Sequence, residues 1–297
     1  MICPTRPPVS GGVGVPAAPD ALASVEPRGN TNLTVISYGG GVQSTALCVL
    51  ATQGVLGVDV AVFANVGDRA ENPQTLAYLT RFIPWAAERG LEVVERRWVD
   101  RTGKVRDLYD DTMSETRRSI DIPVWMAGGA PGNRKCTGNY KIAVVGRELK
   151  ARGATSASPA TVMVGISTDE YQRANRRHAQ PWEIPTYPLL ELGMSRQDCA
   201  NLIERAGLPV PPKSSCWFCP LQGARGWAKK RRDDPDTFAA GVVLEDRINE
   251  TRVRLGRDRV SLAVGGQPLA DLPAAEPALF GDEAFNGGGC DEGYCWT

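Results

Sequence analysis

The sequence has a single histidine, His178, in 297 residues. This disfavours catalysis by a Ser–His or Cys–His pair, and it disfavours metal sites built from several histidines. It also lacks a run of about 18 apolar residues, the length that a membrane-spanning helix needs, so we expect no membrane association. No basic start followed by an apolar stretch opens the chain, and we expect a cytoplasmic protein.

The chain has no excess of charge, because Lys+Arg and Asp+Glu both total 34. This balance excludes a global field that would attract nucleic acid or an anionic membrane. Two local groups are basic, one at 173–178 and one at 229–232. They could hold a phosphorylated or nucleic acid acceptor if they converge, or they could be solvated helix faces. Whether the acceptor is a nucleic acid or a small molecule stays open.

The order of apolar runs and turn residues predicts an α/β protein. We expect strands at 33–38, 58–65, 91–99 and 161–167, alternating with helices at 44–52, 72–89, 140–152 and 195–206. Such alternation favours a Rossmann-like parallel sheet with helices on both faces. We expect a flexible tail at 1–30, a nucleotide-binding α/β domain at 31–210, and a small cysteine-bearing subdomain of helices and loops at 211–297, with a helix at 235–255. A homodimer is one possible assembly.

A glycine loop joins the first expected strand to the first expected helix. Backbone N–H groups at such a junction form an anion-binding concavity, for which phosphate is the natural ligand. A tight turn that simply needs glycine is the alternative. Ser44 and Thr45 could donate hydroxyl groups to phosphate or cap the helix. The candidate nucleotide contacts in this segment are Ser37, Tyr38, Gly39, Gly40, Gly41, Val42, Gln43, Ser44 and Thr45.

This loop resembles the PP-loop of the adenine nucleotide alpha hydrolase superfamily, whose usual form is Ser-Gly-Gly-x-Asp-Ser. The sequence departs from that form at Gly39, in place of the first serine, and at Gln43, in place of the aspartate. Gln43 cannot supply a carboxylate to a magnesium–pyrophosphate complex. The resemblance therefore implies binding of ATP or another adenine nucleotide, with Mg²⁺ possible, more firmly than it implies ATP cleavage.

Later segments resemble the phosphoadenosine phosphosulfate (PAPS) reductase branch of that superfamily. They are 63–68 with 71–75, then 134–142, then 164–173. The resemblance implies that residues 39–45 hold phosphate and that Asn65 and Asp68 border the adenosine. It also implies that Asp169 and Glu170 position a metal or a ribose, while Arg173 pairs with phosphate or sulfate. The alternatives are a helix cap for Asp68 and an ordinary surface salt bridge for the other three.

Cysteines form the second feature of interest. Cys216 and Cys219 in a Cys-x-x-Cys pattern could be a redox pair, half a zinc site or half of a cluster site. The separation from Cys136 resembles that in iron–sulfur sulfonucleotide reductases, although Thr137 replaces the second cysteine of the usual pair. We propose Cys136, Cys216, Cys219 and Cys290 as ligands of a [4Fe–4S] cluster, with Zn²⁺ as the alternative.

The other cysteines are assigned separately. Cys295 is either a substitute cluster ligand or a free reactive thiol, and the tail cysteines could also be unrelated to Cys136. Cys48 and Cys199 lie in apolar helical stripes and are expected in the core. Cys3 falls in the expected tail and receives no function.

These features favour an enzyme that adenylates an acceptor with ATP and then lets sulfur displace AMP, with the cluster carrying or activating sulfur. Sulfur would come from sulfide or a donor protein. The candidate catalytic residues are Ser44, Asp68, Arg173 and Cys295. A sulfonucleotide (PAPS) reductase is the second hypothesis. A nucleotide-binding, metal-stabilised module that catalyses nothing, as a component of a modification or defence system, is the third.

Overall fold

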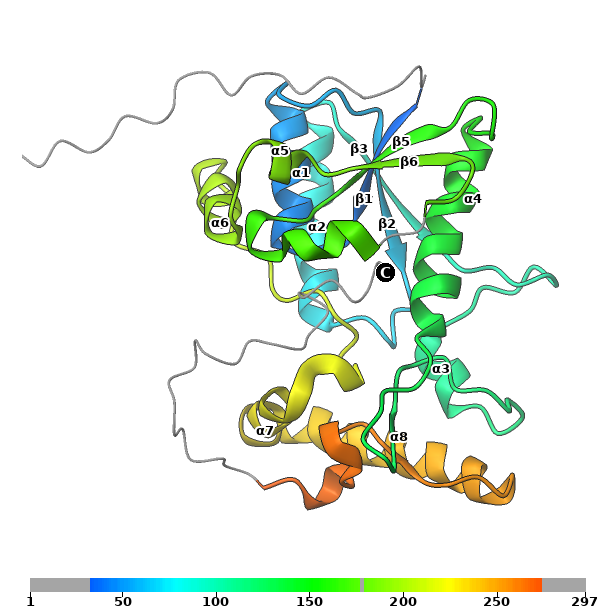
Figure 1. The fold of residues 1–297 in the computed structure, drawn as a ribbon. Helices are drawn as coiled ribbons and strands as arrows, with labels where there is room; N and C mark the ends of the chain where they lie inside the picture. The colour runs from blue at the N-terminus through cyan, green and yellow to red at the C-terminus, as the bar shows by residue number, and fades with distance from the viewer. Residues whose placement is uncertain (1–32, 177–178, 274–297) are drawn as a thin grey trace, which may run out of the picture.

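The computed structural model describes residues 33–176 and 179–273, and its centre is a sheet of parallel strands (Figure 1). The strands follow the order β3-β2-β1-β5-β6 across the sheet. Their bounds are Thr34–Tyr38 for β1, Val60–Asn65 for β2, Glu92–Arg97 for β3, Ala160–Val164 for β5 and Glu183–Thr186 for β6. The predicted α/β class with a parallel sheet is confirmed. The sequence analysis missed β6, a short edge strand that contains Pro185.

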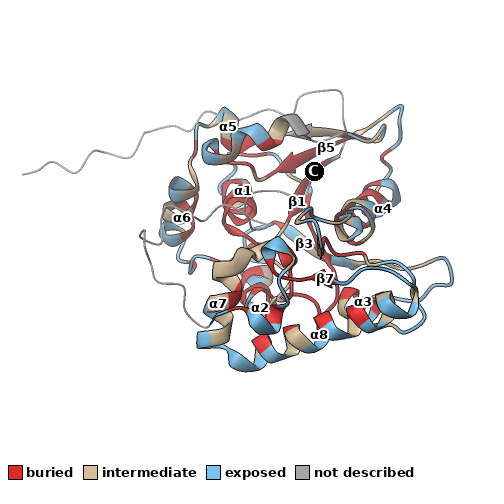
Figure 2. Ribbon diagram, turned by 60° about the horizontal axis from the view of Figure 1, so that its bottom comes forward, coloured by how far each residue is buried: buried red, intermediate tan, exposed pale blue. Residues whose placement is uncertain are grey.

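Helices cover both faces of this sheet because each central strand alternates its side chains between them. Ile36 and Tyr38 pack toward α1 and α2, whereas Val35 packs toward α4 on the opposite face. All of β1, β2 and β5 is buried between these layers, as the red strands of Figure 2 show. The helices are α1 (Val42–Thr52), α2 (Pro73–Ala87), α4 (Ala143–Ala151), the short α5 (Pro188–Glu191) and α6 (Arg196–Arg205).

Local signals account for where two of these helices begin. The Asn72 side chain accepts a hydrogen bond from the Gln74 amide at 2.9 Å, and Pro73 occupies the first helical position of α2. Ser195 and Asp198 form the predicted capping box of α6.

The helix predicted at 140–152 differs from the observed structure. A π-helical turn, η1 (Thr137–Ile142), comes first and α4 follows it directly. The wider turn begins one residue after Cys136, and π-turns of this kind are frequent at functional sites.

A second apolar cluster, here called the Trp227 cluster, lies beyond the ends of the strands (Figure 1). It is centred on Trp227, whose fully buried ring donates its Nε1–H to the Leu262 carbonyl at 3.1 Å. The elements around it are α3 (Leu108–Met113), α7 (Gly223–Asp233), α8 (Pro235–Arg254) and the antiparallel pair β4 (Trp125–Met126) and β7 (Val260–Ser261). The helix predicted at 235–255 is confirmed as α8.

The remaining helical elements of the described residues are 3-10 turns. They are η2 (Thr168–Arg176), η3 (Pro220–Gln222), η4 (Val264–Gly266) and η5 (Leu269–Asp271). Across the two described ranges, no helix combines the length and apolar character needed to cross a membrane. The expected tail at 1–30, together with Cys3, His178, Cys290 and Cys295, lies outside the described residues.

Candidate functional site

The strand order reverses between β1 and β5. The chain passes from β1 through α1 to β2 on one side of β1, whereas β5 is followed by β6 on the other side. Because β1 and β5 are neighbours, their carboxyl ends lie at this switch point. Ligands of open parallel sheets bind at such a switch point. The glycine loop follows β1 at this position, as the sequence analysis expected.

Close packing explains why glycine occupies key positions around this loop. Gly40 has a φ of 73°, a left-handed conformation that favours glycine. A Cβ added to Gly40 would also lie 2.9 Å from Cγ2 of Thr75. Gly165, just after β5, would carry a Cβ only 2.7 Å from the Ser44 amide nitrogen. The loop therefore fits tightly between the start of α2 and the end of β5.

The hydroxyl groups near the loop have different surroundings. Ser44 Oγ accepts from the Gly39 amide and donates to the Gly41 carbonyl, both at 3.2 Å, and so braces the loop. The buried Thr45 hydroxyl lies 3.3 Å from that of Tyr38. Ser37 Oγ and Thr75 Oγ1 are buried and have no hydrogen-bond partner among the described residues. Such groups are costly unless a ligand or water satisfies them.

Gln43 connects the first turn of α1 to the segment after β5. Its side-chain oxygen accepts from Arg196 at 3.1 Å, and its nitrogen donates to Glu170 at 3.3 Å. Glu170 also pairs with Arg173, and their side chains are only 14% and 9% exposed. An ordinary surface salt bridge, the alternative for these residues, does not describe so buried a pair. Asp169 is more exposed and accepts from the Arg196 amide at 2.5 Å.

The end of β2 lies at the same edge of the sheet, beside the end of β1. Asn65 is fully buried and donates to Asp68 at 3.0 Å and to Glu95 at 2.8 Å. Asp68 pairs with Arg97, and this hydrogen bond lowers the pKa of the carboxyl group, which is therefore ionised at neutral pH. The cap of α2 is the Asn72 side chain and not Asp68. The carboxylate thus remains a candidate for ligand contact, held in place by Arg97.

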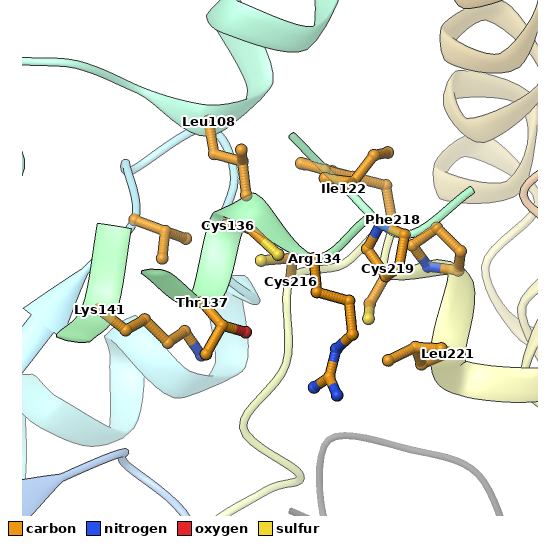
Figure 3. Close-up of a pocket in the computed structure, with 13 residues that line it drawn as sticks. Leu108, Ile122, Arg134, Cys136, Thr137, Lys141, Cys216, Phe218, Cys219 and Leu221 are labelled. Carbon is orange, nitrogen blue, oxygen red and sulfur yellow. The ribbon is translucent and has the colours of Figure 1, made fainter. Parts of the chain in front are cut away.

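Three of the predicted cysteine ligands line one pocket. Cys136, Cys216 and Cys219 come from two distant parts of the chain and share this pocket with Arg134, Lys141 and several apolar side chains (Figure 3). All three are free thiols. Figure 3 shows the sulfur atoms of Cys136 and Cys216 turned toward each other, with the Arg134 side chain extending beside them. The structure therefore brings together the cysteines that the sequence analysis grouped.

Backbone contacts hold the Cys-x-x-Cys loop next to the sheet. The Trp217 amide donates to the Ala70 carbonyl at 3.2 Å, and its ring nitrogen donates to the Arg69 carbonyl at 2.7 Å. The Cys219 amide donates to the Cys216 carbonyl at 3.1 Å, which closes the loop on itself. From the other side, Lys230 of α7 donates to the Trp217 carbonyl. The thiols are thus fixed between the segment after β2 and the Trp227 cluster.

Electrostatics around this pocket disfavour free thiolates but supply positive charge. Burial raises the pKa of all three thiols, that of Cys136 to about 11. Burial alone would lower the pKa of Lys141, but Glu71 and the thiols together raise it, so its ammonium group stays charged. Burial lowers the pKa of Lys230 to about 8. A bound metal group would offset the cost of ionising these thiols.

The donor set consists of three thiols beside two cationic side chains. No group of three or more His, Cys, Asp or Glu side chains in 33–176 and 179–273 is arranged to hold one metal ion. Thiolates of an iron–sulfur cluster bind different iron atoms and need not converge on one point. Three thiols with two neighbouring cations are chemically suited to such a group. The expected further ligands, Cys290 and Cys295, lie outside the described residues.

Comparison with known proteins identifies no family. No model of a protein family matches this chain, and no curated protein matches it either.

Other predicted residues fall elsewhere. Cys48 and Cys199 are fully buried in the core beside α1 and α6, as predicted. In the basic segment at 229–232, Lys229 and Arg232 are exposed and pair with Asp233, whereas Lys230 is turned inward. In the segment 173–178, Arg173 pairs with Glu170.

Sequence reasoning missed several residues that contribute to these sites. Glu71, Thr75 and Lys141 lie within segments that carried the family resemblance, yet none was assigned a role. The signal for Thr75 was its place in the helical turn after β2. Arg196 and Ser214 offered no such signal, because only the folded chain brings them to the loop.

Proposed function

We propose that this chain is an ATP-dependent enzyme of sulfur chemistry, which adenylates an acceptor and then replaces the adenylate with sulfur. One observation carries the proposal. Ser214 packs against Gly41 of the glycine loop, and two residues later Cys216 lines the three-thiol pocket. The glycine loop, which we propose binds the nucleotide phosphates, is thus only two residues from the thiol pocket along this segment. Adenylation creates a leaving group and a sulfur site consumes it, so the reaction needs both.

The proposed reaction has two balanced steps. An oxygen of the acceptor attacks the α-phosphorus of ATP and pyrophosphate leaves, giving an acceptor–O–AMP adduct. Sulfide then attacks the activated carbon, and AMP departs with the electron pair of the carbon–oxygen bond. A persulfide donor would attack in the same way and leave an acceptor–S–S–donor disulfide, which an external thiol then cleaves, releasing the thiolated acceptor and a disulfide between the donor and that thiol. Loop N–H groups and Arg173 would orient the phosphates and stabilise the charge that develops on them.

Cys136, Cys216 and Cys219 would hold a [4Fe–4S] cluster, with Cys290 as the fourth ligand and Cys295 as its substitute or as a free thiol. Held by these three thiols alone, such a cluster would leave one iron to which sulfur can bind, whereas a fourth cysteine ligand would occupy that position. Arg134 and Lys141 would balance the negative charge of the thiolates. Asn65 and Asp68 would border the adenosine, while Asp169 and Glu170 would position ribose or Mg²⁺.

Sulfonucleotide reduction is the second candidate, and Gln43 favours it. The amide at this position hydrogen-bonds to Arg196 and Glu170 and brings no carboxylate to a magnesium–pyrophosphate complex. A PAPS-type substrate, which releases no pyrophosphate, would not require that carboxylate.

Two assays test the proposal. Protein purified without oxygen is analysed for iron, zinc and acid-labile sulfide beside a Cys216→Ala variant, with the matched core variant Cys199→Ala as control. We expect about four irons and four sulfides, lost in Cys216→Ala alone. Stoichiometric zinc in place of iron would contradict the cluster.

The second assay follows products. Pyrophosphate and AMP support adenylation, adenosine bisphosphate and sulfite support the reductase, and binding without turnover supports a non-catalytic module. In each case Ser44→Ala should weaken nucleotide binding, because Ser44 braces the loop.

A further inference from the structure

Ser214 lies against the glycine loop. A Cβ placed on Gly41 would be 2.9 Å from the Ser214 Oγ and 3.7 Å from its Cβ, and the Ser214 Cβ is also 3.9 Å from the same position on Gly40. The hydroxyl group therefore lies directly over the glycines. It comes from the segment between α6 and the Cys-x-x-Cys loop, far from the loop in sequence.

The Ser214 hydroxyl group makes no hydrogen bond to another described residue, and its residue is only partly exposed. Two more hydroxyl groups near the loop, on Ser37 and Thr75, are buried without a partner in the described ranges. Thr75 touches Gly40 through its methyl group. The hydroxyl groups of Ser37, Thr75 and Ser214, together with backbone N–H groups of the loop, form a donor set suited to a phosphate.

We propose that Ser214 donates a hydrogen bond to the phosphate end of the nucleotide held by the glycine loop. This inference rests on the proposed function, since it needs a nucleotide at that loop. It adds a phosphate-binding residue, and it connects the nucleotide loop to the thiol pocket. A phosphate bound by the loop N–H groups and by the Ser214 hydroxyl group would restrain the backbone that continues through Ser215 to Cys216, so nucleotide binding stiffens one wall of the thiol pocket.

Glycine at position 41 agrees with this role. Its φ of −100° is open to any residue, so the backbone conformation does not demand glycine. The constraint comes instead from the space that Ser214 Oγ occupies. A side chain at position 41 would displace this hydroxyl group.

The first experiment measures ATP and adenosine affinity by calorimetry for the full chain, Ser214→Ala and Ser215→Ala. Ser215 is the matched control, because it shares the segment but does not approach the glycines. We expect Ser214→Ala to weaken ATP binding about tenfold, the effect of one hydrogen bond to a charged group. Adenosine affinity should not change. Equal loss for adenosine, or an equal effect of Ser215→Ala, would mean that Ser214 only shapes the segment and would overturn the proposal.

The second experiment measures hydrogen exchange in the peptide that covers 213–219. ATP should slow exchange there in the wild type and in Ser215→Ala, and should do so much less in Ser214→Ala at saturating ATP. A peptide from α8 provides the internal reference. Exchange at 213–219 that does not respond to ATP in the wild type would refute the connection to the thiol pocket.

Failures of the two proposals can be told apart. If Ser44→Ala weakens ATP binding and Ser214→Ala does not, the nucleotide site stands and the role of Ser214 is wrong. If the wild type binds no adenine nucleotide, the proposed function itself is wrong.

Discussion

Gly165 lies where two backbone segments touch, directly after β5 and against the first turn of α1. A Cβ there would lie 2.7 Å from the Ser44 amide nitrogen and 2.9 Å from the Gln43 carbonyl carbon. Because both are backbone atoms, they can move only if α1 shifts. We expect Gly165→Ala to lower the free energy of unfolding by about 1 to 3 kcal/mol, as overpacking does, and to weaken nucleotide binding.

The measurement is urea denaturation with a parallel ATP titration. Gly57→Ala is the matched control, because a Cβ at Gly57 meets open space and φ there is not left-handed. An equally stable Gly165→Ala variant with normal affinity would show that the contact between β5 and α1 is looser than the structure indicates.

Individual residues also show how far sequence reasoning reaches. Cys136, Cys216 and Cys219 were grouped because their spacing resembled a known pattern, and the structure places these three in one pocket. Asn72 and Ser195 were recognised as caps because capping depends on a few adjacent residues. Ser214, Arg196 and Lys141 could not be assigned, because their neighbours at the two sites are set by how distant segments pack and not by local sequence.

Between elements, an ion-pair network joins β3 to α4. Glu148 of α4 accepts from Arg96 at 2.6 Å and from Arg152 at 2.8 Å, and Arg152 also pairs with Glu92. Burial alone would raise the pKa of Glu148, but the hydrogen bonds from the two arginines lower it overall. A carboxyl group with a lowered folded-state pKa stabilises the fold above its unfolded pKa, and that contribution is lost as the pH falls through the folded value.

We therefore expect Glu148→Gln to cost about 1 kcal/mol at pH 7, a value reduced because Arg96 is half-exposed. The difference from wild type should shrink from pH 5 downward and vanish below the folded pKa of Glu148. Denaturation midpoints measured from pH 7 to pH 3 test this, with the exposed Glu204→Gln as control. A difference that stays constant with pH would exclude an electrostatic origin.

The contact between α7 and α8 gives a second prediction for packed elements. A Cβ on Gly241 of α8 would lie 2.8 Å from the buried Trp227 ring. Replacing a helical glycine by alanine ordinarily stabilises by about 0.5 to 1 kcal/mol. Here the overpacking cost of about 1 to 3 kcal/mol is larger, so we expect Gly241→Ala to be less stable than wild type.

Gly226→Ala in α7 is the matched control for this comparison, because its nearest neighbour is the Gln222 side chain, which can move. It should be neutral or stabilising. Thermal unfolding of both variants separates helix propensity from packing, and a stabilised Gly241→Ala would mean that the Trp227 ring moves aside.

The elements that sequence predicted best were the central strands, which are apolar runs, α6, which has an apolar stripe, and the long helix α8. Sequence analysis missed β6 and α7: β6 contains proline at a sheet edge, and α7 buries only Trp227. Tertiary contacts with β5 and with the Trp227 cluster decide their structure. The π-helical turn before α4 was not predicted, because it differs from an α-helix in its backbone hydrogen bonding and not in its apolar pattern.

At the scale of the whole molecule, the thiol pocket joins segments that are far apart in the sequence. Cys136 precedes α4, which packs on the sheet, whereas Cys216 and Cys219 precede α7, and both Cys136 and Cys216 pack against the Trp227 cluster. A metal group bound by all three thiols would cross-link these segments in the folded state alone. Any group that binds the folded state preferentially stabilises it.

Anaerobic reconstitution with iron and sulfide should therefore raise the melting temperature of the wild type, by several degrees if the binding contributes a few kcal/mol. Cys216→Ala should lose this increase. Cys199→Ala, in the core beside α6, should melt at a lower temperature yet keep the increase, because its thiol is remote from the pocket. The diagnostic quantity is thus the difference between reconstituted and untreated protein, which a merely destabilising substitution leaves intact. If reconstitution raises the melting temperature of Cys216→Ala as much as that of wild type, the three cysteines do not act as one binding site.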